Sequence, residues 1–367
     1  MPELCSPEAA REHACDPRLP SELASTRGIL TLAHLLRGKR LLFIGDSMTN
    51  QITQALLCAA RRNLPGGVEP RDAVADLSHV VPECDRLEAQ HQHASMGQRS
   101  PARMQERRAS AFALAHLGWM CSQGDVRRPR LLDRRGRLRL DGFHAPAFNL
   151  TWYPIVGRQM NFVATPSLVS WTGENVSRWP SRLELVSEQD LADVVVFGVG
   201  LHYRSKPSLS DGLRVALRQL QGFARRRHGR AAIIRQISAQ HFNSDGGSYL
   251  TAKAQSDSLV KLVNGSTPTT EPCKPLGGDS SSWYNTVMRR ALDETVGEVA
   301  HALLVRLQPF EELTKPRWDF HIGTKTSDTV RRGVREVVFD CTHFCYSPSF
   351  WDASLYQLYT TLSGALR

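Results

Sequence analysis

A serine that directly follows an apolar segment is the first candidate for chemistry in this sequence. Ser47 ends the segment 40–47 (RLLFIGDS), in which a continuous apolar run leads into Gly-Asp-Ser. A hydroxyl nucleophile must be exposed, must lie within reach of a general base and needs N–H groups directed at the developing oxyanion. We expect Ser47 where a buried strand ends and a helix begins, so that free N–H groups of the first helical turn are available. The tripeptide alone is weak evidence, because Asp46-Ser47 also suits an ordinary helix N-cap and Gly278-Asp279-Ser280 repeats it in a segment predicted to be loop.

The C-terminal segment 339–345 (FDCTHFC) offers a general base and a carboxylate to orient it. Asp340 and His343 are three residues apart, so one turn of the chain can bring both side chains to the same side. The carboxylate can then accept a hydrogen bond from Nδ1–H of the histidine, which leaves Nε2 to take a proton from a hydroxyl. The chain order Ser, Asp, His is typical of parallel α/β enzymes, whose strand ends converge. We therefore predict a catalytic triad of Ser47, Asp340 and His343.

Two other interpretations of this segment stay open. Asp340 and His343 could form a surface pair without a chemical role. Cys341-x-His343-x-Cys345 also contains three potential zinc ligands, but a structural zinc site needs a fourth. The remaining cysteines and histidines do not have the spacing of a standard zinc finger, and we therefore expect no metal.

The elements that would position these residues alternate between strands and helices. Short, continuous apolar runs predict strands that are buried on both faces of a sheet, at 40–44, 193–199, 231–237 and 304–307. Apolar residues at helical spacing predict helices, which follow Ser47, include 213–223 and 283–303, and close the chain at about 350–366. This alternation predicts an α/β fold with a central parallel sheet flanked by helices.

We expect one catalytic domain over residues 39–367, preceded by a polar extension over residues 1–38 that contains an amphipathic stretch at 29–36. An irregular, partly helical insertion is expected at about 62–145, where charges are frequent and periodicity is weak. Residues 147–171 are rich in aromatic and β-branched side chains, which predicts a β-hairpin. Residues 243–281 are rich in Gly, Ser and Thr and are expected to be loop.

Composition and charge restrict the class of protein. The chain has 367 residues, 41% hydrophobic and 22% charged, which is typical of a globular protein with a core. Its formal net charge is +10, with arginine clusters at 127–139 and 225–230. Such clusters suit an anionic partner, but a solvated, arginine-biased surface is the simpler interpretation. Aromatic residues do not alternate with these clusters, so we expect no nucleic-acid partner.

Cysteines and glycosylation sequons favour an oxidising compartment. The eight cysteines could form four disulfides and include no CxxC pair. Three sequons begin at Asn149, Asn175 and Asn264, which predicts a glycoprotein of the secretory pathway. No apolar run approaches the roughly 18 to 20 residues that span a bilayer, and residues 1–16 lack the apolar segment of a signal peptide. A cytosolic protein therefore remains the alternative.

Taken in order, these segments resemble the trichome-birefringence-like and PC-esterase group of the GDSL/SGNH hydrolase superfamily. The resemblance covers most of residues 12–366 and is carried by the segments 37–47, 148–169, 193–203, 235–242, 317–321 and 340–345. Plant members have Trp at the position of Phe344 and Leu-Pro-Gly at Tyr346-Ser-Pro348. They also have Ser-Pro-x-His at 238–241, which is Ser-Ala-Gln-His here, and a Cys-rich N-terminal domain with a membrane anchor. We therefore interpret the chain as a divergent member of this group, and an algal origin is one interpretation of the divergence.

The resemblance implies an SGNH-type fold and O-acetylation of polysaccharides in the Golgi lumen by Ser47, Asp340 and His343. An acyl group would pass from a donor such as acetyl-CoA, through an acyl-enzyme, to a hydroxyl of a polysaccharide or oligosaccharide, with no tightly bound cofactor. A membrane-anchored form is also implied. The oxyanion or substrate-binding residues implied are Gly45, Asp46, Gly200, His202 and His241, with His202 in place of the superfamily's Asn. Structural histidines are the simplest interpretation of His241 and His321.

Two other function classes stay open. An esterase would use the same triad with water as the acceptor, and only exclusion of water from the site would separate it from a transferase. A non-catalytic, glycan-binding or zinc-stabilised secreted domain would make no use of the triad.

Overall fold

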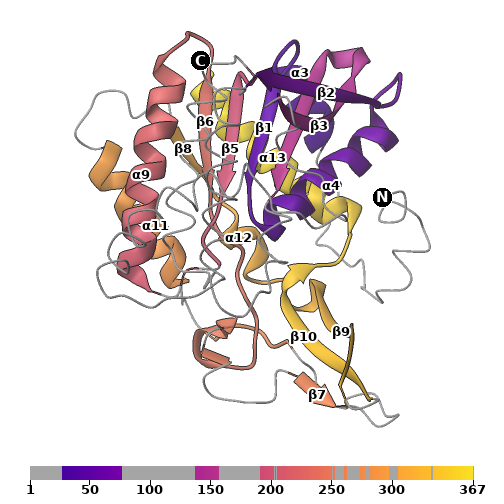
Figure 1. Ribbon diagram of the computed structural model, residues 1–367, viewed down its shortest axis with the longest axis vertical. Helices are drawn as coiled ribbons and strands as arrows, with labels where there is room; N and C mark the ends of the chain where they lie inside the picture. The colour runs from indigo at the N-terminus through magenta and orange to yellow at the C-terminus, as the bar shows by residue number, and fades with distance from the viewer. Residues whose placement is uncertain are drawn as a thin grey trace, which may run out of the picture.

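The protein contains two sheets, of which the larger positions the candidate nucleophile. The computed structural model describes residues 27–76, 137–156, 191–201, 203, 205–249, 251–252, 260–262, 273–277, 282–296, 305–331 and 334–366. A seven-stranded, mostly parallel sheet forms the centre of the molecule. A three-stranded antiparallel sheet lies below it in Figure 1, beyond the carboxyl ends of the parallel strands.

The central sheet has the strand order β2-β3-β4-β1-β5-β6-β8. Its strands are β1 (Arg40–Gly45), β2 (Glu69–Asp76), β3 (Arg137–Ala145), β4 (Leu150–Val156), β5 (Val194–Gly198), β6 (Ala231–Arg235) and β8 (Val305–Gln308). From β4 to β8 all neighbours are parallel, whereas β2 and β3 form an antiparallel edge. In chain order the five parallel strands read 2-1-3-4-5, so the direction of winding reverses between β1 and β5. Doubly wound sheets bind ligands beyond the carboxyl ends of the strands at this switch point.

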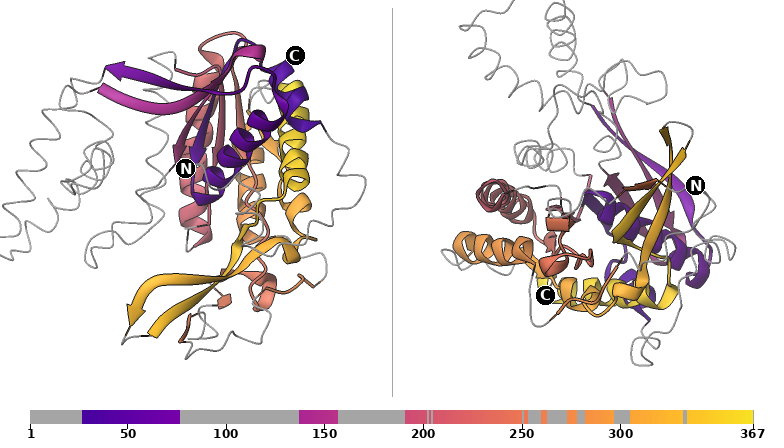
Figure 2. Two further views of the ribbon diagram at one scale, coloured as in Figure 1. Left: turned by 90° about the vertical axis from the view of Figure 1, so that its right-hand side faces the viewer. Right: turned by 90° about the horizontal axis from the view of Figure 1, so that it is seen from below.

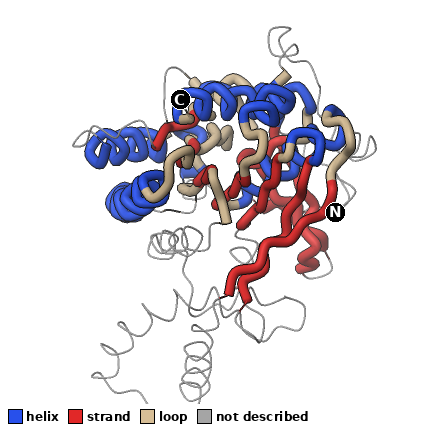
Figure 3. Tube along the Cα trace, turned by 90° about the horizontal axis from the view of Figure 1, so that it is seen from above, coloured by secondary structure: helices blue, strands red, loops and turns tan. Residues whose placement is uncertain are grey.

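Helices cover both faces of the sheet (Figure 3). One face packs against α3 (Gly28–Leu35), α4 (Ser47–Asn63) and α13 (Pro348–Ala365), and the other against α9 (Lys206–Arg225) and α11 (Trp283–Val296). The sequence of β1 is continuously apolar because both faces of this strand are covered by helices. Leu41 and Phe43 face the first group of helices, Leu42 and Ile44 face the second, and all four are fully buried, because successive side chains of a strand point to opposite faces.

The smaller sheet consists of β7 (Val260–Leu262), β9 (His321–Arg331) and β10 (Val334–Phe344), in the order β7-β10-β9. The β9–β10 hairpin extends away from the central sheet and its helices (Figure 2). Short helical turns complete the described chain: η3 (Pro146–Phe148), η5 (Asp245–Gly247), α12 (Glu311–Thr314) and η7 (Trp318–Phe320). The second strand of the hairpin ends at the segment 340–344, so it carries the predicted base and its carboxylate.

The predicted α/β architecture is confirmed, whereas three local predictions need correction. The described part of the insertion at 62–145 forms β2 and β3, which extend the central sheet, and residues 77–136 lie outside the described residues. The first half of the predicted hairpin at 147–171 is instead β4, a parallel neighbour of β1 whose antiparallel partner β3 precedes it. Residues 157–171 are not described. The predicted loop at 243–281 contains β7.

The end of the predicted extension packs on the domain through helix α3. The N–H groups of Gly28 and Ile29 donate to the Asp352 carboxylate of α13, at 2.9 and 3.0 Å. A carboxylate at a helix N-terminus satisfies N–H groups that have no partner within the helix. Among the helices described, none is long and apolar enough to cross a membrane.

Candidate active site

The Gly-Asp-Ser turn is fixed by its contacts with β5. A Cβ atom on Gly45 would lie 2.4 Å from the carbonyl oxygen of Gly198, so only glycine fits where β1 and β5 meet. The Asp46 N–H donates to that same carbonyl at 3.2 Å. Asp46 is also the N-cap of α4, because its carboxylate accepts from the Met48 N–H at 3.1 Å. These contacts set Ser47 at the first position of α4, directly beyond the end of β1.

The structure brings the three predicted triad residues together in the predicted order of contacts. Ser47 Oγ lies 2.7 Å from Nε2 of His343, and Nδ1 of His343 lies 2.8 Å from Oδ2 of Asp340. A carboxylate can only accept, so Nδ1 carries the proton and Nε2 can accept from the Ser47 hydroxyl. The arrangement is that of a nucleophile, a general base and an orienting carboxylate.

A bulge in β10 explains how Asp340 and His343 can meet. In a regular strand, residues three apart point to opposite faces. Here Asp340 pairs with Gly323 and Phe344 pairs with His321, so three residues of β10 lie opposite one residue of β9. The Asp340 Oδ1 atom closes the bulge by accepting from the N–H groups of Thr342 and His343, at 3.2 and 3.0 Å. Bulges commonly redirect side chains beside functional sites.

The contacts of Asp340 keep its carboxylate ionised. Burial would raise the pKa of Asp340, but its hydrogen bonds with the His343 side chain and with the two backbone N–H groups outweigh burial, and the pKa lies below its usual value. A negative charge at this position stabilises the imidazolium that forms when His343 takes a proton.

Gln51 ties the helix that carries Ser47 to the strand that carries His343. Its side-chain Nε2 donates to the Phe344 carbonyl at 2.9 Å, and its Oε1 accepts from the Phe344 N–H at 3.1 Å. Gln51 lies one turn after Ser47 in α4, and Phe344 directly follows His343. This pair of hydrogen bonds therefore helps to set the distance between the nucleophile and the base.

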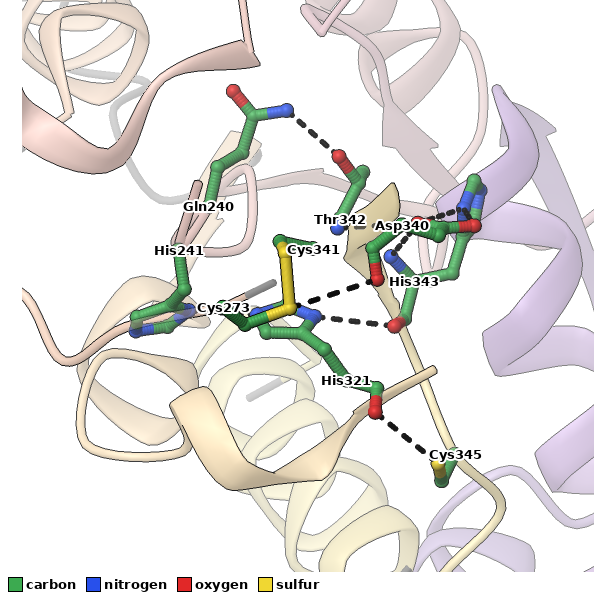
Figure 4. The surroundings of a disulfide bond; sticks show 9 residues. All are labelled: Gln240, His241, Cys273, His321, Asp340, Cys341, Thr342, His343 and Cys345. Carbon is green, nitrogen blue, oxygen red and sulfur yellow. Dashed lines mark hydrogen bonds and ion pairs between the residues drawn. A yellow bond between two sulfur atoms is a disulfide. The ribbon is translucent and has the colours of Figure 1, made fainter. Parts of the chain in front are cut away.

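The residue between Asp340 and Thr342 is anchored by a disulfide. Cys273 and Cys341 form a disulfide with a Cα–Cα distance of 5.5 Å, shown in Figure 4. The Gln240 side chain donates to Thr342 Oγ1 at 2.9 Å. The four cysteines of the described ranges, Cys58, Cys273, Cys341 and Cys345, are all disulfide-bonded.

These disulfides contradict the zinc interpretation of Cys341-x-His343-x-Cys345. The cysteine ligand of zinc is a thiolate, which Cys341 and Cys345 do not provide while oxidised. Within the described residues, no group of three or more His, Cys, Asp or Glu side chains is placed to hold a metal ion.

The turn after β5 contains Gly200, a residue predicted for the oxyanion site, and starts from the strand next to β1. Gly45 and Gly198 are paired in adjacent strands, and Gly200 follows two residues later. Gly200 has φ +155°, and a Cβ there would lie 2.0 Å from Cδ1 of Ile237. Glycine therefore lets the backbone turn against the Ile237 side chain. The candidate oxyanion donors are the Ser47 and Gly200 N–H groups, whereas His202 lies outside the described residues.

The sequence-based prediction gave no role to a buried arginine that lies under the nucleophile turn. Arg235, at the end of β6, is 2% exposed, and its Nη2 donates to Thr49 Oγ1 at 3.2 Å. The Thr49 hydroxyl in turn donates to the Gly198 carbonyl at 3.0 Å. Burial lowers the pKa of Arg235 to about 10, with the Asp46 carboxylate acting in the opposite direction. Arg235 is therefore charged at neutral pH, and a charged residue that ends an apolar strand was the signal in the sequence.

His241, which was also a candidate for substrate binding, is fully buried. Its ring lies between the Lys315 carbonyl and the ring of His321. The contacts of Asp46 are likewise those of a helix cap. Ser280, the serine of the second Gly-Asp-Ser, is not among the described residues.

Comparison with protein-family models and with curated proteins finds no match to this chain. The roles proposed for Ser47, His343 and Asp340 therefore depend on the geometry of the site.

Proposed function

We propose that the protein is a serine-dependent acyltransferase with Ser47 as nucleophile, His343 as general base and Asp340 as the carboxylate that orients it. The observation that carries this proposal is the continuous hydrogen-bonded chain from Ser47 through His343 to Asp340. Its position supports the proposal, because Ser47 follows β1 at the switch point of the sheet, where α/β proteins bind ligands.

In the first half of the reaction, Ser47 Oγ attacks the carbonyl carbon of an acyl donor while Nε2 of His343 takes the hydroxyl proton. The tetrahedral intermediate carries a negative oxygen, and the Ser47 and Gly200 N–H groups are the donors that we propose to stabilise it. The intermediate then collapses, the bond to the leaving group breaks, and His343 returns the proton to that leaving group. Ser47 is left as an acyl ester.

In the second half, an acceptor hydroxyl gives its proton to His343 and attacks the acyl-enzyme. Collapse of the second intermediate releases the acylated acceptor and returns the proton to Ser47. Asp340 holds the same imidazole tautomer in both halves, since its contact with Nδ1 leaves Nε2 directed at Ser47.

We further propose that the transferred group is acetyl and that the acceptor is a hydroxyl of a polysaccharide or oligosaccharide. This proposal is based on the resemblance to the trichome-birefringence-like and PC-esterase group, and with it to the SGNH fold. The doubly wound sheet, with its serine directly after β1, is compatible with that fold. The disulfides and sequons support a secretory location such as the Golgi lumen, and acetyl-CoA is one candidate donor.

Hydrolysis of acyl esters is the second candidate function. The side chain of His343 is 28% exposed, so water can reach the general base that would activate an acceptor. A transferase has to limit this access when the acyl-enzyme forms.

The test is to incubate the protein with p-nitrophenyl acetate and, separately, with acetyl-CoA, each with and without a neutral oligosaccharide. Intact-protein mass spectrometry should show one acetyl group, and peptide mapping should place it on Ser47. Ser47→Ala should abolish labelling, and Ser280→Ala should leave it unchanged, as a matched control in the other Gly-Asp-Ser. Acetylated oligosaccharide indicates a transferase, free acetate alone indicates an esterase, and labelling that survives in Ser47→Ala refutes both.

A further inference from the structure

Two buried histidines form a hydrogen-bonded chain that ends on the backbone of the candidate base. His241 Nδ1 lies 2.6 Å from Nε2 of His321, and His241 Nε2 lies 2.8 Å from the Lys315 carbonyl oxygen. On the other side, Nδ1 of His321 lies 3.1 Å from the carbonyl oxygen of His343. Figure 4 shows His321 between His241 and the backbone of His343.

Neither histidine can contact a substrate from its present position. His241 is fully buried and His321 is 6% exposed. His321 is also held against β10, because its backbone pairs with Phe344 and the centroids of the two rings are 4.3 Å apart. Any effect of the pair on chemistry therefore has to pass through the segment that carries His343.

The number of protons in this chain is one short of what its contacts require. Both ends of the chain are carbonyl oxygens, which only accept, so both outer contacts need an N–H. The central contact between the two rings needs one more. Three contacts thus need three protons, whereas two neutral imidazoles carry two. A pair with three protons would be an imidazole with an imidazolium.

The surroundings decide between these two charge states. Burial lowers the pKa of both histidines, that of His321 to about 3, and His241 adds to the lowering at His321. The backbone hydrogen bonds with Lys315 and His343 and the carboxylates of Asp319 and Asp340 act in the opposite direction, but burial outweighs them. At neutral pH the pair therefore holds two protons, and one of its three contacts is left without a hydrogen.

Three arrangements would leave one contact without a hydrogen, but the 2.6 Å separation of His241 Nδ1 and His321 Nε2 requires a hydrogen between the two rings, which excludes two facing lone pairs. The two arrangements that remain differ at His343. With protons on Nε2 of both rings, His321 turns a lone pair towards the His343 carbonyl. With protons on Nδ1 of both rings, His321 donates to that carbonyl and His241 instead turns a lone pair towards Lys315. Only the second arrangement holds the backbone of His343 by a hydrogen bond.

We propose that His321, supported by His241, is a positioning residue that holds the His343 carbonyl through its Nδ1–H and so keeps the base aligned with Ser47. This inference rests on the proposed acyl-transfer function. It extends that function, because the side chain of His343 is already fixed by Asp340, while side chains of His321 and Gln51 contact the backbone on its C-terminal side in addition to the pairing with β9.

Three substitutions at His321 separate this role from simple packing. In His321→Asn the amide nitrogen takes the place of Nδ1, so the donor to His343 is kept and the link to His241 is lost. In His321→Gln the amide reaches the place of Nε2, so the link to His241 is kept and the donor is lost. His321→Phe keeps the ring and loses both hydrogen bonds.

The measurements are the burst rate of Ser47 acetylation by p-nitrophenyl acetate and hydrogen exchange of residues 341–345 by mass spectrometry. We expect His321→Phe and His321→Gln to lower the burst rate about 10- to 100-fold, as small misalignments of reacting groups do, with little change in the apparent KM. Exchange of residues 341–345 should become faster in the same two variants. His321→Asn should remain close to the wild type in both measurements.

Equal losses in His321→Asn and His321→Gln would overturn the proposal and indicate a packing role. Wild-type rates in all three variants would overturn it as well. Should His321→Phe unfold, the comparison of Asn with Gln still decides, since both carry the same amide group. A wild-type protein that is not acetylated on Ser47 would refute the proposed function itself, and the exchange pattern would still show whether His321 holds the His343 backbone.

Discussion

Replacing Asp340 by asparagine should stop the chemistry and leave the fold intact. The two carboxylate oxygens have different tasks, because Oδ1 accepts from the backbone N–H groups of Thr342 and His343 and Oδ2 makes the shorter contact with the His343 ring. In Asp340→Asn the amide oxygen should take the Oδ1 position, since an NH2 group there would face two donors. The amide NH2 then faces Nδ1 of His343.

An NH2 group donates, so the imidazole would have to turn a lone pair to the introduced amide and carry its proton on Nε2. In that tautomer His343 cannot accept the proton of Ser47. The corresponding change in another serine triad lowers kcat about 10⁴-fold, which corresponds to about 5.5 kcal/mol of transition-state stabilisation. We expect a loss of this order in the burst rate with p-nitrophenyl acetate, and a melting temperature close to that of the wild type.

The matched control is Asp340→Ala, which also removes the acceptor for the two backbone N–H groups. It should therefore lower the melting temperature as well as the rate, because buried donors without a partner cost about 1 to 3 kcal/mol each. The double variant Ser47→Ala/Asp340→Asn should be barely slower than Ser47→Ala alone, since the members of a triad act as one unit. Retention of more than about a tenth of the wild-type rate in Asp340→Asn, or additive losses in the double variant, would refute the assigned role of Asp340.

Three further predictions concern the surroundings of the triad. Gln51→Ala leaves the Phe344 N–H and carbonyl without their side-chain partner. It should lower the free energy of unfolding, measured by chemical denaturation, by about 2 kcal/mol and should also lower the burst rate. Gln51→Glu can still accept from the Phe344 N–H and should lose less stability. Arg235→Met should retain the fold, because a buried, incompletely paired charge can often be replaced by an apolar side chain of similar volume. Acetylation of Ser47 should become slower, because a positive charge beneath the nucleophile turn is lost. Unfolding of this variant would contradict the prediction. Between pH 6.5 and about 3 the unfolded chain binds a proton at His321 that the folded protein does not. The free energy of unfolding should therefore fall as the pH decreases, and His321 should contribute about 1.4 kcal/mol per pH unit to this fall. The His321→Phe variant should lack this contribution when its stability is measured against pH.

The parts of the site that the sequence predicts are those fixed by local composition. The apolar run before Ser47 predicts a strand with two buried faces, and a turn at its end is the only place for Gly-Asp-Ser. Asp340 and His343 are close in sequence, so their contact needs no knowledge of the fold. The sequence predicts that one turn of the chain brings the two side chains together. In the structure they meet across a bulge in β10 instead. A bulge depends on the register with β9, and register is a property of two strands.

The elements that the sequence does not predict lack the apolar pattern of a core strand. β9 reads HIGTKTSDTVR and β2 reads EPRDAVAD, so neither shows the continuous apolar run of a buried strand nor a clear alternation. Arg235 ends a strand whose other residues are apolar and fully buried, so the apolar pattern predicts the strand but assigns no role to its last residue. The contact of His241 with His321 joins residues 80 positions apart, which no local pattern can indicate.

The separation of Ser47 from His343 is controlled by contacts that do not include either side chain. Ser47 belongs to the central sheet and α4, whereas His343 belongs to the smaller sheet, so their 2.7 Å contact spans two structural units. Gln51 joins these units at Phe344, the Cys273–Cys341 disulfide holds the other end of the bulge, and His321 holds the carbonyl between them. A base on a regular strand would need none of these contacts, but a bulge leaves backbone groups without ladder partners and each has to be satisfied elsewhere. The contacts that stabilise the bulge are therefore the same ones that align the base, and substitutions at Gln51 or His321 should reduce acylation before they unfold the protein.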